Sequence, residues 1–218
     1  GDSASLALHS RLRSNGARTT LALSSTSNTT VTRLSLALVR LQNRVRKHGT
    51  WSTHVDRFIA LTEFARAKFI EGGVPGAKIA VKPNFAADNP IPAGAIRTGA
   101  LFVGRLSPEK GIVELVTAWP LLPHIPLTII GDGPLLVEIS KIAPTNVRLL
   151  GRQASHIVRS EMGKASLLVV PSTCYEGFPM VVAEAFSASL PVAASRLGSL
   201  AEIVVDGWNG LHFAPGNS

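Results

Sequence analysis

The chain has 218 residues, of which 45% are hydrophobic, so it can form one or two domains with a substantial core. Its 22 Lys and Arg residues exceed its 14 Asp and Glu residues, and the formal charge of +8 favours anionic partners, although a solvated basic surface explains it equally well. The single cysteine excludes a disulfide within the chain and fits a reducing compartment, and no apolar run is long enough to span a membrane.

The first part of the chain, residues 1–84, precedes a predicted domain boundary. Leucines and a valine recur every three to four residues over 32–48, with basic residues between them, which predicts a basic amphipathic helix. Such a helix lies on an acidic membrane surface or, as we favour, packs on a neighbouring element. The pattern then predicts a strand at 57–61, a helix over 62–71 with a threonine cap, and a strand at 79–81.

Residues 85–98 contain Pro90, Pro92 and Gly94 and are predicted to link this part to a second domain over 99–218. In the second domain, short apolar strands alternate with helices. The predicted strands are Ala100–Val103, Leu127–Ile130, Val147–Leu150, Leu167–Val170 and Pro191–Ala194. The predicted helices are Glu109–Trp119, Leu135–Ile142, Ser155–Lys164, Pro179–Ala188 and a short one near Leu200–Val205. This alternation predicts an α/β fold with a parallel sheet that helices cover on both faces.

Glycines and charged residues follow the predicted strands. The segments after the first four strands are Gly104–Gly111, Gly131–Pro134, Gly151-Arg152 and Ser172–Gly177. Because ligands of parallel α/β sheets lie outside the carboxyl ends of the strands, we expect these segments to form one site.

Two glutamates eight residues apart flank the start of the predicted helix at 179–188. Pro179 suits the first position of that helix, which places Glu176 in the loop before it and Glu184 in its second turn. The free N–H groups of a helix start lie between the two carboxylates and attract anions. This series of polar groups suits a nucleotide-diphosphate sugar.

Each glutamate also has an ordinary interpretation. In this interpretation, Glu176 stabilises the helix start and Glu184 is an ordinary residue on the helix surface. The neighbours Ala183, Ala185 and Phe186 instead predict a largely buried helix, in which a charge needs a partner.

Arg105 and Lys110 lie five residues apart, between a strand end and a helix. An Arg fork and a Lys point charge together suit a diphosphate, whereas either residue alone is an ordinary surface charge. Gly131, Gly133 and Gly177 let the backbone approach a ligand or serve as ordinary turn residues.

Several other residues carry no predicted chemistry. Asp132 suits a turn, and Cys174 suits packing rather than nucleophilic attack. The six histidines have no metal-ligand spacing, so no metal site is predicted. Basic residues are not interleaved with aromatic ones, which argues against nucleic acid as a partner.

The segments Gly104–Gly111, Gly131–Pro134 and Glu176–Glu184, in this order, resemble glycosyltransferase family 4. The resemblance reaches back to Asp56–Thr62 and Val81–Asn84, which look like the end of the first domain and the domain crossing. It implies a retaining enzyme of the GT-B fold, with two Rossmann-like domains that face a cleft. Residues 1–84 would then be the tail end of the N-terminal domain, and residues 99–218 most of the donor-binding C-terminal domain.

By this resemblance, Arg105 and Lys110 hold the donor diphosphate and act in catalysis together with Glu176, which contacts the donor sugar. Glu184 binds the ribose, and the backbone near Gly151-Arg152 meets the base. The implied donor-binding residues are Gly104, Arg105, Lys110, Gly131, Gly133, Gly151, Arg152, Glu176, Gly177, Phe178, Met180, Val181 and Glu184. No cofactor or metal is implied, and the co-substrate is a nucleotide sugar, a UDP-sugar by preference or a GDP-sugar.

Two departures from the family pattern follow. Ser189 stands where the family has glycine, which predicts strain at a helix end. Relative to the family, most of the first domain and the terminal helices after Ser218 are missing, so we expect a fragment.

The implied reaction moves a sugar to a glycan or lipid-linked acceptor in cell-surface polysaccharide synthesis. It would take place in the cytoplasm, at the inner face of the membrane, which the basic segment 33–47 would contact. Two alternatives stay open: a non-catalytic nucleotide-sugar-binding module or inactive fragment, and a dehydrogenase. The dehydrogenase is disfavoured because Gly131–Leu136 lacks the last glycine of Gly-x-Gly-x-x-Gly.

Overall fold

The structure, a computed structural model, describes residue 49 and residues 53–89 and 96–216. The chain divides into two compact units, residues 1–49 and 50–218, and all described residues except Gly49 belong to the second. The basic helix predicted over 32–48 and part of the predicted linker lie outside the described residues. The predicted domain boundaries stay predictions.

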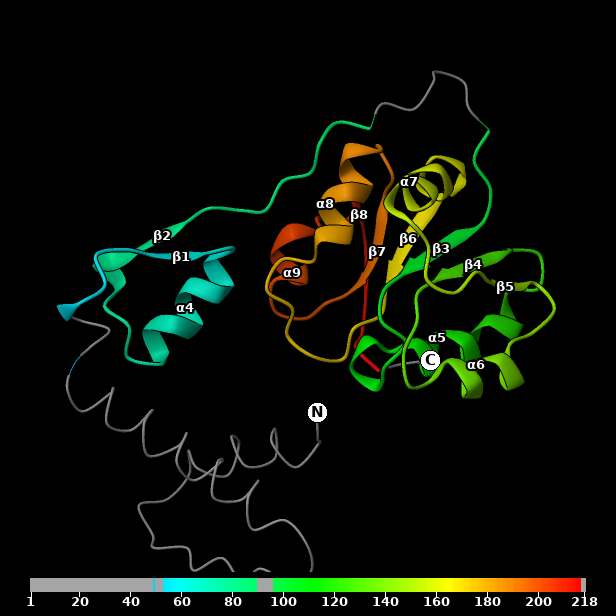
Figure 1. Cartoon of the computed structure of the whole chain (residues 1–218), viewed down its shortest axis with the longest axis horizontal. Helices are drawn as coiled ribbons and strands as arrows, with labels where there is room; N and C mark the ends of the chain where they lie inside the picture. The colour runs from blue at the N-terminus through cyan, green and yellow to red at the C-terminus, as the bar shows by residue number, and fades with distance from the viewer. Residues whose placement is uncertain (1–48, 50–52, 90–95, 217–218) are drawn as a thin grey trace, which may run out of the picture. The chain divides into compact units, whose positions relative to one another are not determined.

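Six parallel strands form one sheet in the second unit, which confirms the predicted α/β fold (Figure 1). The strands are β3 (Ala100–Val103), β4 (Leu127–Ile130), β5 (Val147–Leu149), β6 (Leu167–Val170), β7 (Val192–Ser195) and β8 (Gly210–Phe213). Their order is β5-β4-β3-β6-β7-β8, and every neighbouring pair is parallel. The chain order reverses between β3 and β6, which is where such sheets bind their ligands.

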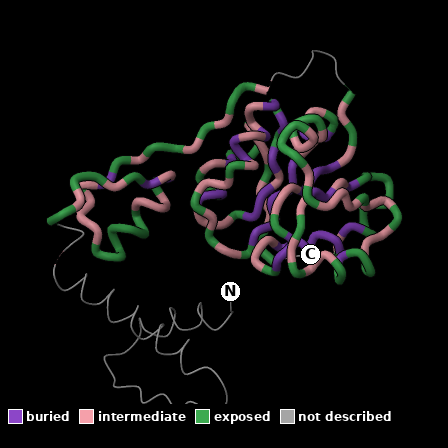
Figure 2. Tube along the Cα trace, viewed as in Figure 1, coloured by how far each residue is buried: buried purple, intermediate pink, exposed green. Residues whose placement is uncertain are grey.

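Helices cover both faces of the sheet. Successive side chains of each strand point to opposite faces and therefore pack against different helices. The helices are α5 (Ile112–Ala118), α6 (Leu136–Ile142), α7 (Ser155–Lys164), α8 (Met180–Ser187) and α9 (Leu200–Ile203). Leu101 of β3 packs in a buried cluster with residues of α7, α8 and α9. Its neighbour Phe102 packs in a second cluster with residues of α5 and α6. The buried part of the chain in Figure 2 follows these strands and the inner faces of the helices.

A smaller β-α-β unit precedes this sheet. Strand β1 (Phe58–Ala60) pairs in parallel with β2 (Ile79–Val81), and helix α4 (Glu63–Glu71) connects them. The predicted threonine cap is confirmed, since Thr62 Oγ1 accepts a hydrogen bond from the Ala65 N–H at 3.0 Å.

The predicted helix Glu109–Trp119 is wrong in its first turn. A 3-10 turn covers Pro108–Lys110, and α5 begins only at Ile112. Gly111 separates them with a φ of 65°, and a Cβ there would lie 1.9 Å from the Pro171 carbonyl oxygen. The backbones therefore approach too closely for any side chain at this position.

The start of helix α8 also differs from the prediction by one residue. Pro179 is the N-cap, with extended backbone angles of −61° and 125°, and Met180 is the first helical residue. The predicted burial of this helix is confirmed for Val182, Ala183 and Ala185, whereas Phe186 is only partly buried and Met180 is 46% exposed.

The end of α8 carries the expected strain at Ser189. Its φ is 51°, and no other non-glycine residue of the described chain has a positive φ. The N–H of Leu190 donates to Ala185 O at 2.8 Å and that of Ser189 to Phe186 O at 2.9 Å, as in a left-handed helix end that favours glycine. The Arg97 guanidinium donates to Ser189 O at 2.8 Å and so helps to close the helix.

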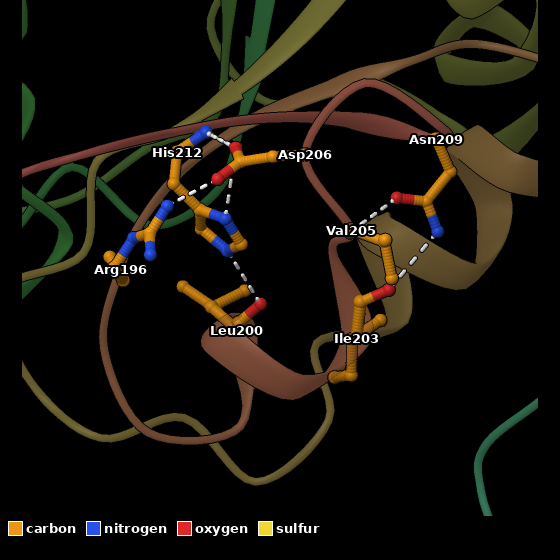
Figure 3. Close-up of polar contacts among 7 residues, drawn as sticks. All are labelled: Arg196, Leu200, Ile203, Val205, Asp206, Asn209 and His212. Carbon is orange, nitrogen blue, oxygen red and sulfur yellow. Dashed lines mark hydrogen bonds and ion pairs between the residues drawn. The ribbon is translucent and has the colours of Figure 1, made fainter.

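The edge strand β8 was not predicted. Polar side chains hold the turn before it, as Figure 3 shows. Asn209 Oδ1 accepts from the Val205 N–H at 2.7 Å. Asp206 accepts from the His212 N–H at 2.6 Å and pairs with Arg196. These contacts fix the start of β8 beside β7.

Candidate functional site

The loops that follow β3, β4, β5 and β6 meet at the carboxyl edge of the sheet. An open pocket of about 610 Å³ lies at the ends of β3, β4 and β5. Its lining residues are Val103, Gly104, Arg105, Ile130, Gly131, Asp132, Gly133, Arg152, Gln153 and Val158. Five predicted donor-binding residues thus lie around one pocket: Gly104, Arg105, Gly131, Gly133 and Arg152.

The remaining predicted residues do not line this pocket. They are Lys110, Gly151, Glu176, Gly177, Phe178, Met180, Val181 and Glu184. Apart from Lys110, which follows β3, and Gly151, which follows β5, they lie in the loop after β6 or in α8. Because β6 is the direct neighbour of β3, this second group belongs to the same sheet edge.

Gly131 and Gly133 have a packing reason to be glycine. A Cβ at Gly131 would lie 1.8 Å from Gly104 O, and one at Gly133 would lie 2.4 Å from Leu106 O. The Leu106 N–H donates to Asp132 O at 2.9 Å across the same contact. These glycines therefore let the loops after β3 and β4 pack closely against each other. This is the second of the two predicted roles, that of ordinary turn residues.

Gly177 differs from these two glycines. The nearest atom to a Cβ placed there would be Leu61 Cδ1 at 3.7 Å, an ordinary packing distance. Packing within the described chain therefore does not require glycine at this position. A role in ligand approach stays a prediction for Gly177.

Arg105 and Lys110 have different surroundings. Arg105 is exposed, and its guanidinium makes no hydrogen bond or ion pair with any described residue. Lys110 Nζ instead lies 2.6 Å from Glu176 Oε1, in an ion pair whose side chains are 28% and 14% exposed. The sequence predicted both residues at the site but not their different partners.

Ser172 begins a segment that the sequence placed at the site, but the sequence analysis gave this residue no role. Its Oγ donates to Glu176 Oε1 at 2.7 Å, and the residue is buried. The loop position predicted for Glu176 is confirmed, and the loop is held at both ends. At its far end, Asn84 Nδ2 donates to Phe178 O at 2.9 Å. A serine directly behind a strand end, four residues before a glutamate, was the available signal for Ser172.

The start of α8 is open to a ligand. No described side chain caps it. The N–H groups of Met180 and Val181 have no hydrogen-bond acceptor among the described residues, and the first bonded one is Val182 N–H, to Pro179 O at 3.0 Å. Free N–H groups at a helix start attract anions, and the positive end of the helix dipole adds to this attraction.

Glu184 lies in the second turn of α8, as predicted. It is partly buried, and no described residue donates a hydrogen bond to its carboxylate. The nearby Ser187 hydroxyl donates to the Glu184 main-chain oxygen at 2.8 Å instead. A half-buried carboxylate without a partner is able to accept hydroxyl hydrogen bonds from a ligand.

Two groups at this edge have shifted pKa values. The Ser107 hydroxyl, 2.6 Å from Glu109 Oε1, lowers the pKa of that carboxyl. Burial, with help from the charge of Glu176, raises the pKa of the Cys174 thiol. A thiol that stays protonated is a poor nucleophile, which agrees with the packing role predicted for Cys174.

Metal and membrane features are absent from the part of the chain that the structure describes. No three His, Cys, Asp or Glu side chains within 53–89 and 96–216 gather closely enough to hold a metal ion. None of the described helices has the length and apolar character needed to cross a bilayer.

The family model described as Glycosyl transferases group 1 matches residues 97–218. An uncharacterised glycosyltransferase of Methanocaldococcus jannaschii is 44% identical over 115 residues, which cover 51% of this chain and 32% of that protein. The lipopolysaccharide 1,2-N-acetylglucosaminetransferase of Salmonella typhimurium is 30% identical over 186 residues, 72% of this chain and 49% of that protein. The chain therefore spans about a third to a half of the length of these relatives.

The chain also resembles solved structures of the GT-B fold, which confirms that fold class. One of these is HepE of Anabaena in complex with UDP, with a TM-score of 0.66 and 25% identity. The likeness covers 75% of this chain and 51% of HepE.

Proposed function

The chain belongs to the glycosyl transferases group 1 family, and we propose that it acts in moving a sugar from a nucleotide-diphosphate sugar to a glycan or lipid-linked acceptor. One observation carries this proposal. The uncapped start of α8 lies between Glu176 in the loop before it and Glu184, whose carboxylate has no described partner. An anion site between two carboxylates matches the order sugar, diphosphate and ribose.

The proposed roles follow this order. The free N–H groups of Met180 and Val181, together with Arg105 and Lys110, hold the diphosphate. Glu184 accepts hydrogen bonds from the ribose hydroxyls. These groups suit their roles because a carboxylate only accepts hydrogen bonds, whereas backbone N–H groups and basic side chains only donate them.

The remaining roles concern the two ends of the donor. Glu176 contacts the sugar near the reacting carbon. The pocket beside Arg152, at the carboxyl ends of β3, β4 and β5, receives the base. Open space of about 610 Å³ at this place supports that assignment.

The proposed chemistry is a family 4 transfer with retention at the anomeric carbon and without a metal ion. Positive charge builds on the sugar while negative charge builds on the departing diphosphate. Arg105, Lys110 and the start of α8 would stabilise that negative charge, which lowers the barrier more than it tightens donor binding. Chelation by EDTA tests metal independence, and we expect unchanged activity.

UDP is the proposed nucleotide, with GDP as the second candidate. The fold likeness to a protein solved with UDP supports this order. The name of the Salmonella relative supports cell-surface polysaccharide as the product. We propose that the enzyme works in the cytoplasm at the inner membrane face.

A nucleotide-sugar-binding module without transfer activity is the competing proposal. UDP release from UDP-glucose and related donors, measured with the complete gene product and candidate acceptors, separates the two. A transferase should release UDP much faster with acceptor present than without it, and Glu176→Gln should abolish that acceptor-dependent release while UDP still binds. The surface variant Glu138→Gln, on α6, should keep full activity. Donor binding without any release over a broad acceptor panel would favour the module.

The product of the same reaction tests retention. NMR coupling constants of the new glycosidic bond report the anomeric configuration directly. We expect the configuration of the donor, and the opposite configuration would exclude the retaining mechanism.

A further inference from the structure

Ser172 and Lys110 both donate to the same oxygen of Glu176. Ser172 Oγ lies 2.7 Å from Oε1, and Lys110 Nζ lies 2.6 Å from it. Two donors on one oxygen, from loops that follow neighbouring strands, fix the carboxylate in one orientation.

The second oxygen of Glu176 is left open by this arrangement. A carboxylate oxygen has two acceptor positions, so Oε1 is fully occupied. Oε2 has no hydrogen-bond partner among the described residues, and it is not one of their buried unpaired atoms. Because the side chain is only 14% exposed, water can reach Oε2 only in part, and a ligand hydroxyl there would replace a missing hydrogen bond.

The two donors are not equivalent. Lys110 has a long, flexible side chain, and its ammonium is also needed by the diphosphate in the proposed function. Ser172 is 1% exposed, has a short side chain and lies two residues after β6. Ser172 can therefore keep its hold on Oε1 when a diphosphate attracts Lys110.

We propose that Ser172 is a positioning residue that holds Oε1 of Glu176 and so presents Oε2 to a hydroxyl of the donor sugar. This inference rests on the proposed function, since it assumes that a nucleotide sugar occupies this edge of the sheet. Ser172 touches Glu176 and not the donor. It should therefore affect recognition of the sugar and leave recognition of the nucleotide unchanged.

The test compares the affinities of the 218-residue chain for UDP and for UDP-glucose by calorimetry. In the wild type, UDP-glucose should bind more tightly than UDP because Oε2 accepts a hydrogen bond from the sugar. Ser172→Ala should weaken UDP-glucose by about tenfold, the value of one hydrogen bond to a charged group, and leave UDP unchanged. Ser172→Thr keeps the hydroxyl and should restore the preference for UDP-glucose.

Ser199→Ala is the control. Ser199 is also a buried serine, its hydroxyl shares a hydrogen bond of 2.9 Å with the Thr62 hydroxyl, and it lies outside the segments of the proposed site. It should lower the melting temperature as Ser172→Ala does and keep the ratio of the two affinities. This control separates positioning from a general loss of stability.

Four other outcomes would overturn the inference, and they differ in what they say of the proposed function. Unchanged affinities for both ligands in Ser172→Ala, or a wild type that binds UDP and UDP-glucose equally, refute the positioning role and leave nucleotide binding intact. An equal loss of both ligands shows a purely structural role. A folded wild type that binds neither UDP nor UDP-glucose refutes the proposed function itself, and the inference with it.

Discussion

Lys110 and Glu176 lie 66 positions apart in the chain, yet Lys110 Nζ and Glu176 Oε1 are 2.6 Å apart. The pairing of β3 with β6 brings their loops together at the carboxyl edge of the sheet. Both residues were predicted to contact the donor, and they also contact each other. A diphosphate at this edge must therefore share Lys110 with a carboxylate.

Replacing Lys110 should weaken nucleotide binding directly. We expect Lys110→Met to lower the affinity for UDP by about tenfold or more, because a hydrogen bond between charged groups contributes about 1.5–3 kcal/mol. Calorimetric titration with UDP measures the effect. Lys141→Met removes an exposed lysine from the last turn of α6 and should change nothing. Equal UDP affinity in Lys110→Met and the wild type would remove Lys110 from the site.

Gly131 should tolerate no side chain. A Cβ in Gly131→Ala would lie 1.8 Å from Gly104 O, so the interlocked loops must separate. We expect the free energy of unfolding to fall by about 2–4 kcal/mol, measured by urea denaturation.

Gly207→Ala is the control for backbone strain alone. Gly207 has a φ of 75°, and a Cβ there would meet nothing within 4 Å, so the expected loss is about 1 kcal/mol. Similar losses in both variants would show that the contact between the loops after β3 and β4 contributes little.

Ser189→Gly should stabilise the protein. The left-handed conformation at Ser189 strains any residue with a Cβ, and glycine removes that strain at a smaller cost in chain entropy. We expect a gain of about 1 kcal/mol in the free energy of unfolding, seen as a higher melting temperature. Ser189→Ala keeps the Cβ and should bring no gain. A melting temperature that rises equally in both variants would point to the serine hydroxyl instead.

Cys174 should react slowly with iodoacetamide at neutral pH. Burial and the charge of Glu176 raise the pKa of its thiol, and only the thiolate reacts. The folded protein holds this proton more tightly than the unfolded chain does. The protonated thiol therefore adds to the stability of the folded protein below the pKa of the unfolded thiol. This added stability is lost as the pH rises through the pKa of the folded thiol.

Alkylation rates measured from roughly pH 7 to pH 10 should therefore have a higher midpoint in the folded chain than in urea. Glu176→Gln removes one negative charge and should move the folded midpoint downward. Identical midpoints in the folded and unfolded chain would show that the thiol is not shielded.

The regular parts of the fold could be predicted because local sequence determines them. Strands β3, β4 and β6 have their predicted bounds, since each is a short apolar run that ends at a glycine or proline. Strand β8 escaped prediction because it is an edge strand whose Leu211 is 64% exposed, which hides the apolar pattern. The break at Gly111 depends on a contact with Pro171, 60 residues away, that no local pattern reveals.

The site was predictable in its position and less so in its contacts. The residues after each strand end could be named because a parallel sheet gathers them at one edge. The hydrogen bond from Ser172 and the ion pair of Lys110 with Glu176 depend on side-chain geometry between two loops. Gly131 and Gly133 matched the family pattern, but their close contacts are with the protein itself.

Calorimetric titration of the chain with UDP, GDP and ADP tests the proposed donor site most directly. We predict that one nucleotide binds, UDP by preference, and that Arg105→Ala and Glu184→Ala each weaken it by about tenfold or more. Arg159→Ala and Glu138→Ala, two exposed residues on α7 and α6, should bind as the wild type does. A chain that is folded by circular dichroism and binds none of the three nucleotides would contradict the account, as would unchanged binding in Arg105→Ala and Glu184→Ala.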